Sequence, residues 1–303
     1  MVTTPTLLVL GAGASLHYGF QLGHDLLRQI AANIIDSLFG PTIAQASNST
    51  ALTVLEFAHD LRQSRRSSID AFIESRAADY DAIGRCAIAH HLLLFESDDT
   101  LFPAIHLDWY SALFDAILGN SPEAFRTNQL RVITFNFDRS FERALYLALC
   151  SNFGDRRASE LLAVLPILHV HGDLGDLPWA ERDGTPHVRL YEPGRTLENI
   201  RACSERIKII HHDIPRETRN RIREWFGWVR RVYFIGFSYH ESNLVKLGIP
   251  GSLEGKTAVG TIYGMGPGQL SRMRRLAGNT ISAVPAEWTA VDAVRQYDWF
   301  YEG

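Results

Sequence analysis

The feature that most constrains the fold is a short apolar stretch near the N-terminus that ends in small residues. Residues 7–10 read Leu-Leu-Val-Leu, and residues 11–15 read Gly-Ala-Gly-Ala-Ser. An apolar run bounded by glycine is typical of a buried strand, and small residues let a backbone turn come close to a ligand. Where a helix follows such a turn, its unpaired N–H groups favour phosphate. The sequence therefore predicts a strand and a phosphate-binding turn at residues 7–15.

Three later segments repeat this pattern of an apolar strand that ends in polar or small residues. They are residues 131–138 (RVITFNFD), 167–173 (ILHVHGD) and 232–238 (VYFIGFS). Strands that alternate with helical segments predict an α/β fold with a doubly wound parallel sheet, Rossmann-like in type. Ligands of such sheets bind beyond the carboxyl ends of the strands. We therefore expect these strand ends to line one cleft.

A long helical region separates the first two of these strands. From residue 51 to residue 119 the pattern is helical and no strand is expected. A Ser, Thr and Asn-rich stretch predicts an exposed loop at residues 41–50. The expected helices cover residues 24–35, 52–62, 68–94 and 106–118. Such a block is long for a simple crossover. We interpret residues 24–126 as a helical insertion in a discontinuous Rossmann-like domain of residues 1–23 and 127–303.

The second part of the chain alternates regularly. Strands are expected at 130–135, 166–170, 232–236, 257–263 and 280–284. Helices are expected at 139–149, 158–164, 196–203, 216–229 and 267–277, with a last helix from residue 286. Residues 174–195 are rich in glycine, proline and charge, which predicts a long loop.

Composition excludes several classes of protein. With 303 residues and 46% hydrophobic content the chain can bury a substantial core. The net charge of −4 comes from mixed acidic and basic residues, which gives no reason to expect direct nucleic-acid binding. No apolar run approaches the ~20 residues that cross a bilayer, and we expect no membrane association. Three widely spaced cysteines exclude a zinc ribbon and favour a reducing cytoplasm.

The glycine-rich turn is only part of a dinucleotide-binding fingerprint. Leu16 stands where such a fingerprint has Gly or Ala, and no acidic residue closes a second strand about 20 residues onward. A plain strand-to-helix turn is the alternative interpretation.

Polar residues at two other strand ends are candidates for chemistry. Asn136 is unusual in an extended segment and is expected to point into the cleft, whereas Asp138 is also well placed as a helix N-cap. His171 stands at a strand end beside Gly172, where a base reaches substrate. A metal site formed by His169, His171 and Asp173 is a weaker alternative, because no second set of ligands is evident.

The last strand end and a basic helix complete the set of candidates. Gly236 and Ser238 close an apolar strand, and the Ser238 hydroxyl can donate to a phosphate or ribose oxygen. The pair His211-His212 is expected in a surface loop, and Asn243 in a structural role. The arginines between residues 216 and 231 are interpreted as a solvated helical face rather than a partner or nucleic-acid surface.

Taken together, the motifs resemble the sirtuin superfamily, and more closely the sirtuin-like NAD-cleaving proteins of bacterial anti-phage defence systems. The resemblance spans residues 7 to 243 and rests on four motifs in order: Gly11-Ala12-Gly13-x-Ser15, Thr134-x-Asn136-x-Asp138, His171-Gly172 and Gly236-x-Ser238. It implies that Gly11, Ala12, Gly13, Ser15, Gly236 and Ser238 bind NAD. It also implies that Asn136 positions the attacking water, that Asp138 holds the nicotinamide carboxamide and that His171 is the catalytic histidine.

Departures from the superfamily pattern narrow the expected activity. Protein-deacylating sirtuins carry a zinc module with four cysteines and an arginine-bearing segment after the first turn, where this chain has Gln21. The resemblance therefore implies NAD hydrolysis without zinc in the cytoplasm, rather than deacylation. It further implies a homo-oligomer, or a helicase-type (HerA-like) ATPase or short Argonaute partner, in antiviral defence by abortive infection. A non-catalytic NAD or ADP-ribose binding module and a metal-dependent phosphoesterase built on His171, Asp173 and Asp138 are the alternatives.

Overall fold

The protein is built on a six-stranded, all-parallel sheet. The structure, a computed structural model, describes residues 1–36, 39–66, 68–180, 187–209 and 214–296. The strand order is β3-β2-β1-β4-β5-β6. The strands are β1 (Thr6–Leu10), β2 (Leu130–Thr134), β3 (Ile167–His169), β4 (Arg231–Ile235), β5 (Thr257–Gly260) and β6 (Ser282–Ala283). This order confirms the α/β, Rossmann-like fold and places the reversal of strand order between β1 and β4.

The first strand lies at the centre of the sheet because it pairs on both sides. Leu8 lies opposite Val132 of β2 and Tyr233 of β4, and every residue of β1 is buried. Alternate residues point to opposite faces, so that Leu8 and Leu10 join one hydrophobic core and Leu7 and Val9 another. A strand buried on both faces reads as a continuous apolar run, which is why the sequence reveals it.

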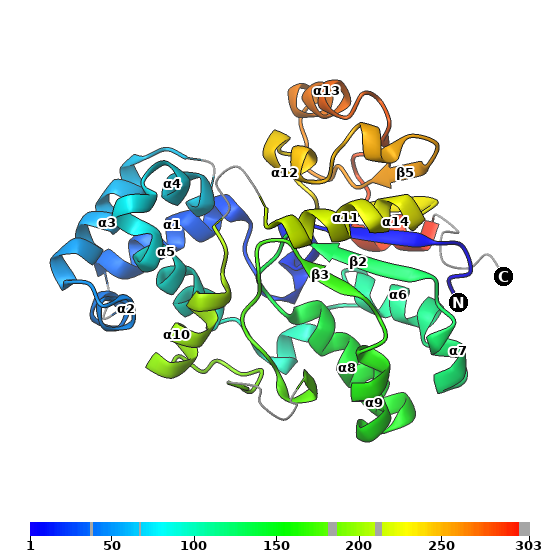
Figure 1. The fold of residues 1–303 in the computed structure, drawn as a ribbon, viewed down its shortest axis with the longest axis horizontal. Coiled ribbons are helices and arrows are strands. Elements are labelled where there is room, and N and C mark those ends of the chain that lie inside the picture. The colour runs from blue at the N-terminus through cyan, green and yellow to red at the C-terminus, as the bar shows by residue number, and fades with distance from the viewer. Residues whose placement is uncertain (37–38, 67, 181–186, 210–213, 297–303) are drawn as a thin grey trace.

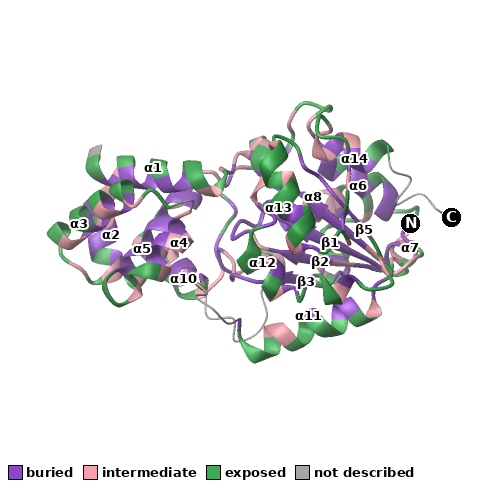
Figure 2. Cartoon of the chain, turned by 90° about the horizontal axis from the view of Figure 1, so that it is seen from above, coloured by how far each residue is buried: buried purple, intermediate pink, exposed green. Residues whose placement is uncertain are grey.

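Helices cover both faces of the sheet (Figures 1 and 2). One core packs the sheet against α6 (Trp109–Ile117), α7 (Pro122–Arg126), α8 (Ser140–Phe153), α9 (Asp155–Leu162) and α14 (Ala290–Gln296). The other core packs it against α11 (Arg216–Trp228), α12 (Glu241–Lys246) and α13 (Pro267–Leu276).

A third core belongs to a block of helices beyond one end of the sheet, drawn at the left of Figure 1. The block consists of α1 (Gly23–Asp36), α2 (Phe39–Ser47), α3 (Ala51–Gln63), α4 (Ile69–Ser75), α5 (Ala77–Leu92) and α10 (Leu197–Arg206). Phe137 and Leu174, from the loops after β2 and β3, pack into the same core. The block is therefore held against the carboxyl edge of the sheet. The boundaries at residues 24 and 126 stay a prediction.

Several local expectations were wrong. Residues 41–50 were predicted to form an exposed loop, but most of them belong to α2, where Ile43 and Ala46 are buried. Packing of these small and apolar side chains on α3 and α5 overrides the loop-favouring composition. The helix expected over 68–94 is broken at Arg76, and the short helix α12 was not predicted. His211, His212 and Asp213 lie outside the described residues.

Among the described residues, no helix combines the length and apolar character needed to cross a membrane.

Candidate functional site

The turn after β1 differs from the predicted phosphate-binding turn. It consists of two short 3₁₀ segments, η1 (Ala12–Ala14) and η2 (Leu16–Tyr18), and the first α-helix begins only at Gly23. Its amides bond within the protein: Gly13 N donates to Gly236 O (3.0 Å), Ala14 N to Gly11 O (2.8 Å) and Ser15 N to Ala12 O (3.2 Å). The helix N-terminus expected to attract phosphate therefore does not follow this turn directly.

Glycines let the turns after β1 and β4 touch at the point where the strand order reverses. A Cβ atom on Gly11 would lie 2.6 Å from the carbonyl oxygen of Gly236, and one on Gly13 would lie 2.8 Å from the Gly236 Cα. Gly236 has a φ of +60°, and a Cβ there would overlap the backbone nitrogen of Ala14. Two predicted NAD-binding segments are thus adjacent, and the glycines serve this backbone contact.

Asn136, Ser15 and Asp138 form one hydrogen-bond cluster. Asn136 Nδ2 donates to Gly11 O (3.0 Å) and to Ser15 Oγ (2.9 Å). Ser15 Oγ donates to Asp138 Oδ1 (3.1 Å). These three side chains connect the turn after β1 to the loop after β2.

Asp138 also anchors the start of α8. Its Oδ1 accepts hydrogen bonds from the backbone nitrogen (3.1 Å) and the hydroxyl of Ser140, and that hydroxyl also bonds to Tyr110 OH (2.8 Å). Burial raises the pKa of Asp138, while the hydroxyls of Ser140 and Ser15 oppose the rise. The cavity beside Ser15, Asn136 and Asp138 measures only about 10 Å³, which is room for about one water. This cavity is too small to hold a nucleotide.

His171 lies just beyond β3, among aromatic side chains. Its ring centroid is 5.6 Å from that of Phe135 and 6.1 Å from that of Phe137. No described residue hydrogen-bonds to its Nδ1, which is buried. Burial, together with a smaller effect of the positive charge of Lys246, lowers the pKa of His171 to about 4. The imidazole is therefore neutral near neutral pH.

The side chains of Asn136 and His171 do not join one network. The extended chain after β2 turns Phe135 and Phe137 toward His171, whereas Asn136 between them turns toward Ser15. His171 therefore lies at the same edge of the sheet but outside the Asn136 cluster. Ser238 is exposed and Ala12 half-buried.

Sequence reasoning missed a buried charged network beneath these loops. His169 Nε2 pairs with Glu142 Oε1 (2.7 Å), His169 Nδ1 bonds to Asn136 O (3.0 Å), and Arg139 Nε donates to Glu142 Oε1 (2.7 Å). Burial alone lowers the pKa of His169, but the Glu142 carboxylate outweighs it and raises the pKa. The available signal was a pair of opposite charges three residues apart in the first turn of a sheet-packing helix.

The loop after β3 is held by further ion pairs. Arg206 of α10 pairs with Asp173 (Nε to Oδ1, 2.7 Å) and with Asp176 (NH1 to Oδ2, 3.0 Å). The charge of Arg139 and the hydrogen bond from Arg206 outweigh burial and lower the pKa of Asp173. Both nitrogens of His169 and the carboxylate of Asp173 are thus engaged. Within the described parts of the chain, no group of three or more His, Cys, Asp or Glu side chains is arranged to hold a metal ion.

Buried histidines predict that the protein loses stability in mild acid. Burial lowers the pKa of His90, His91 and His171 to about 4, from 6.5. The unfolded chain binds these protons first, so the free energy of unfolding falls as pH drops from about 6.5 toward 4, by up to about 3 kcal/mol for each histidine. Thermal melts across this range test the prediction. His90→Leu should flatten the pH dependence and exposed His59→Leu should not; an unchanged slope in His90→Leu would contradict it.

Comparisons with known proteins add no assignment. No protein-family model matches this chain, and no curated protein sequence matches it.

Proposed function

We propose that this protein is an NAD⁺ hydrolase that releases nicotinamide and ADP-ribose. The observation that carries the proposal is His171, a neutral, buried imidazole at the carboxyl edge of the sheet whose Nδ1 has no hydrogen-bond partner among the described residues. Supporting it, the turns after β1 and β4 meet where the strand order reverses, which is where dinucleotides bind in Rossmann-like sheets. The proposal includes a sirtuin-type fold with a helical insertion at residues 24–126.

The proposed chemistry needs no strong nucleophile. When the bond between the ribose C1′ and the nicotinamide nitrogen breaks, its electron pair leaves with nicotinamide and positive charge develops on the sugar. Water then adds through its oxygen and loses a proton. Neutral His171 accepts a proton from a ribose hydroxyl or from this water, while the amide of Asn136 orients the water. Asp138 holds the nicotinamide carboxamide.

The remaining predicted residues would hold the rest of the substrate. In the proposal, Gly11, Ala12, Gly13 and Ser15 contact the pyrophosphate and the adjoining ribose. Gly236 and Ser238 support the same nucleotide. No zinc is required by this reaction.

The closed Asn136 cluster supports a latent enzyme. With a cavity of about 10 Å³ beside Ser15, Asn136 and Asp138, NAD reaches these groups only when the loops open. We propose that assembly into a homo-oligomer, or binding of a helicase-type ATPase or short Argonaute partner, opens them. The active protein would then deplete cytoplasmic NAD as an effector of anti-phage defence.

Release of nicotinamide and ADP-ribose from NAD by the purified chain tests this function, with and without high protein concentration and candidate partners. His171→Ala should lower turnover by ~100-fold or more, because general-base catalysis contributes about 10²–10⁴. His59→Ala, a change at an exposed histidine, should leave turnover unchanged. Melting temperatures of both variants show that they are folded.

Two outcomes would reject the hydrolase. Turnover that persists in His171→Ala would show that His171 does not take part in the reaction. A wild-type protein that binds NAD but leaves it intact under every activating condition would favour the alternative function, a signalling module that binds NAD or ADP-ribose without cleaving it.

A further inference from the structure

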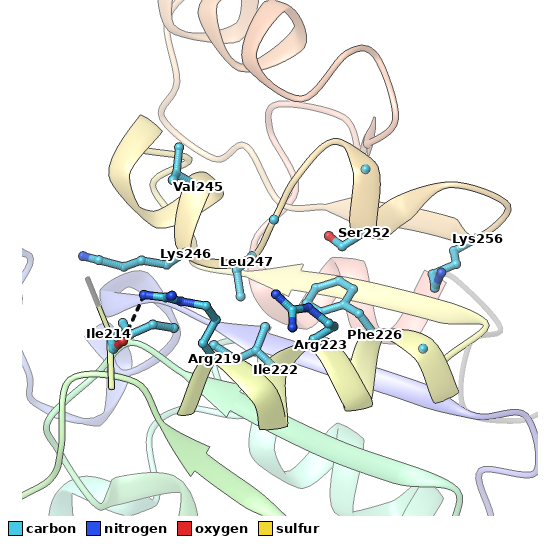
Figure 3. A pocket seen from close by; sticks show the side chains of 13 residues that line it. Ile214, Arg219, Ile222, Arg223, Phe226, Val245, Lys246, Leu247, Ser252 and Lys256 are labelled. Atoms are coloured by element: carbon cyan, nitrogen blue, oxygen red, sulfur yellow. Dashed lines mark hydrogen bonds between the residues drawn. The ribbon is translucent and has the colours of Figure 1, made fainter. Parts of the chain in front are cut away.

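A second pocket lies outside the Asn136 cluster, between α11 and the segment that runs from α12 to the 3₁₀ turn η5 (Gly251–Leu253). We call it the α11 groove (Figure 3). Its volume is about 460 Å³, in the range of small-molecule sites and far larger than the cavity beside Asn136.

Four cationic side chains line the α11 groove. Arg219 and Arg223 lie four residues apart on one face of α11, and Lys246 and Lys256 come from the opposite wall. Figure 3 shows Arg219 and Lys246 near one end, Arg223 at the middle and Lys256 toward the other end. Among the described residues, no Asp or Glu lines the groove. The groove is therefore positive in a protein whose net charge is −4.

The acidic residues of α11 are directed elsewhere. Glu217 pairs with Arg221 (3.2 Å), and Glu224 pairs with Arg131 of β2 (3.6 Å). Neither carboxylate lines the groove. Arg223 forms no ion pair with the described residues and is available to an anion. The basic stretch that the sequence indicated as a solvated face is thus divided, with Arg219 and Arg223 on the groove side.

The floor of the groove is apolar. Ile222 and Phe226 of α11 lie there with Leu247, and Gly227 leaves space beside them because a Cβ at that position would meet no atom within 4 Å. On the opposite wall the Ser252 hydroxyl oxygen is buried, and no described residue hydrogen-bonds to it. The lining thus combines phosphate-binding groups with a surface for a planar or apolar moiety.

Lys246 places one cation of the groove near the candidate active site. Burial lowers the pKa of Lys246, whereas the carboxylates of Asp70 and Glu74 on α4 raise it. Its charge also acts on His171. An anion in the groove would compensate this partly buried ammonium in addition to the arginines.

We propose that the α11 groove binds a phosphorylated small molecule with a planar or apolar organic part, such as a nucleoside diphosphate. Arg219, Arg223 and the two lysines bind the phosphates, since guanidinium and ammonium groups are the usual phosphate ligands. The Ser252 hydroxyl donates to a phosphate or sugar oxygen. The organic part lies on the floor of Ile222 and Phe226. This proposal does not require NAD cleavage, and Lys246 is the groove residue whose charge also acts on His171.

Calorimetric titration of the full chain with ADP, adenosine and pyrophosphate tests the groove. ADP should bind more tightly than either fragment, because it uses both the cations and the floor. Arg223→Ala should weaken ADP binding by about tenfold or more, the loss typical of a charged hydrogen bond. Gly227→Leu should weaken it similarly by filling the groove while every cation stays. Arg221→Ala, an exposed change on the same helix, should have no effect.

Three results would overturn the proposal: no binding of ADP, ADP affinity that is unchanged in both Arg223→Ala and Gly227→Leu, or pyrophosphate that binds as tightly as ADP. ADP binding that is lost in His171→Ala but kept in Arg223→Ala would place the ligand at the carboxyl edge of the sheet, and it would also overturn the groove. If the groove does not bind ADP, the result of the NAD cleavage assay is unaffected, so the two proposals are tested separately.

Discussion

Gly236→Ala should lower the free energy of unfolding by about 3 kcal/mol or more, as measured by urea denaturation. Gly236 adopts a φ of +60°, a region that costs an alanine about 1 kcal/mol or more. The larger effect comes from contact, because the new methyl group would overlap the backbone nitrogen of Ala14. The turns after β1 and β4 must then separate, and the hydrogen bond from Gly13 N to Gly236 O (3.0 Å) is lost.

Gly227→Ala is the matched control for this prediction. Gly227 lies within α11, and a Cβ there would meet no atom within 4 Å. Alanine is the better helix former, so this change should stabilise the protein by up to about 1 kcal/mol. If Gly236→Ala were as stable as the wild type, the close contact between the two turns would be wrong.

Arg189→Ala should cost about 3–5 kcal/mol of unfolding free energy, because it leaves a buried carboxylate without its partner. Glu96 is 0% exposed and Arg189 3% exposed, and the pair is bidentate, with NH2 to Oε1 at 2.7 Å and a second contact between NH1 and Oε2. Glu96 follows helix α5, whereas Arg189 belongs to the loop after β3. The ion pair therefore joins two distant parts of the chain.

The loss of unfolding free energy in Arg189→Ala should also depend on pH. Burial raises the pKa of Glu96, and the guanidinium of Arg189 opposes that rise. Without Arg189 the pKa rises further. A carboxyl whose pKa is raised on folding stabilises the folded state at low pH and loses that contribution as pH rises. The difference from the wild type should therefore be smaller at about pH 5 than at about pH 8, in denaturation experiments on both proteins.

An exposed ion pair provides the comparison. Arg221→Ala removes the pair with Glu217, whose carboxyl side chain is 85% exposed, and should change stability by less than about 0.5 kcal/mol. A similarly small effect of Arg189→Ala at every pH would contradict the buried ion pair. Glu96→Leu with Arg189→Met should recover most of the loss, because neither charge then remains buried.

Local patterns predicted the sheet well and the contacts between loops poorly. β1 and β4 are apolar runs bounded by polar or small residues, so their position could be inferred without tertiary information. The helix α2 could not be inferred, because the Ser, Thr and Asn content of residues 41–50 favours a loop, whereas contacts with α3 and α5 bury Ile43. Residues that are distant in the chain, such as Glu96 and Arg189, carry no local sign of their pairing.

For the candidate residues, the sequence indicated that they lie at one edge of the sheet but not the directions of their side chains. Asn136, Ser15 and Asp138 come together in one hydrogen-bond cluster. His171 points instead toward Phe135 and Phe137, because its direction depends on how two loops leave their strands. The α11 groove was missed for a similar reason: the spacing of Arg219 and Arg223 shows one wall, and only the fold supplies the other.

The two neighbours of Asn136 are anchored in different bodies of the molecule. Phe137 packs into the core of the helical block, whereas Phe135 packs against the sheet core and lies 5.2 Å from the ring of Phe237. Any rotation of the block relative to the sheet must therefore twist the peptide units on either side of Asn136. A molecule that binds only to the outer helices could therefore change the backbone conformation at Asn136 without contacting the edge of the sheet.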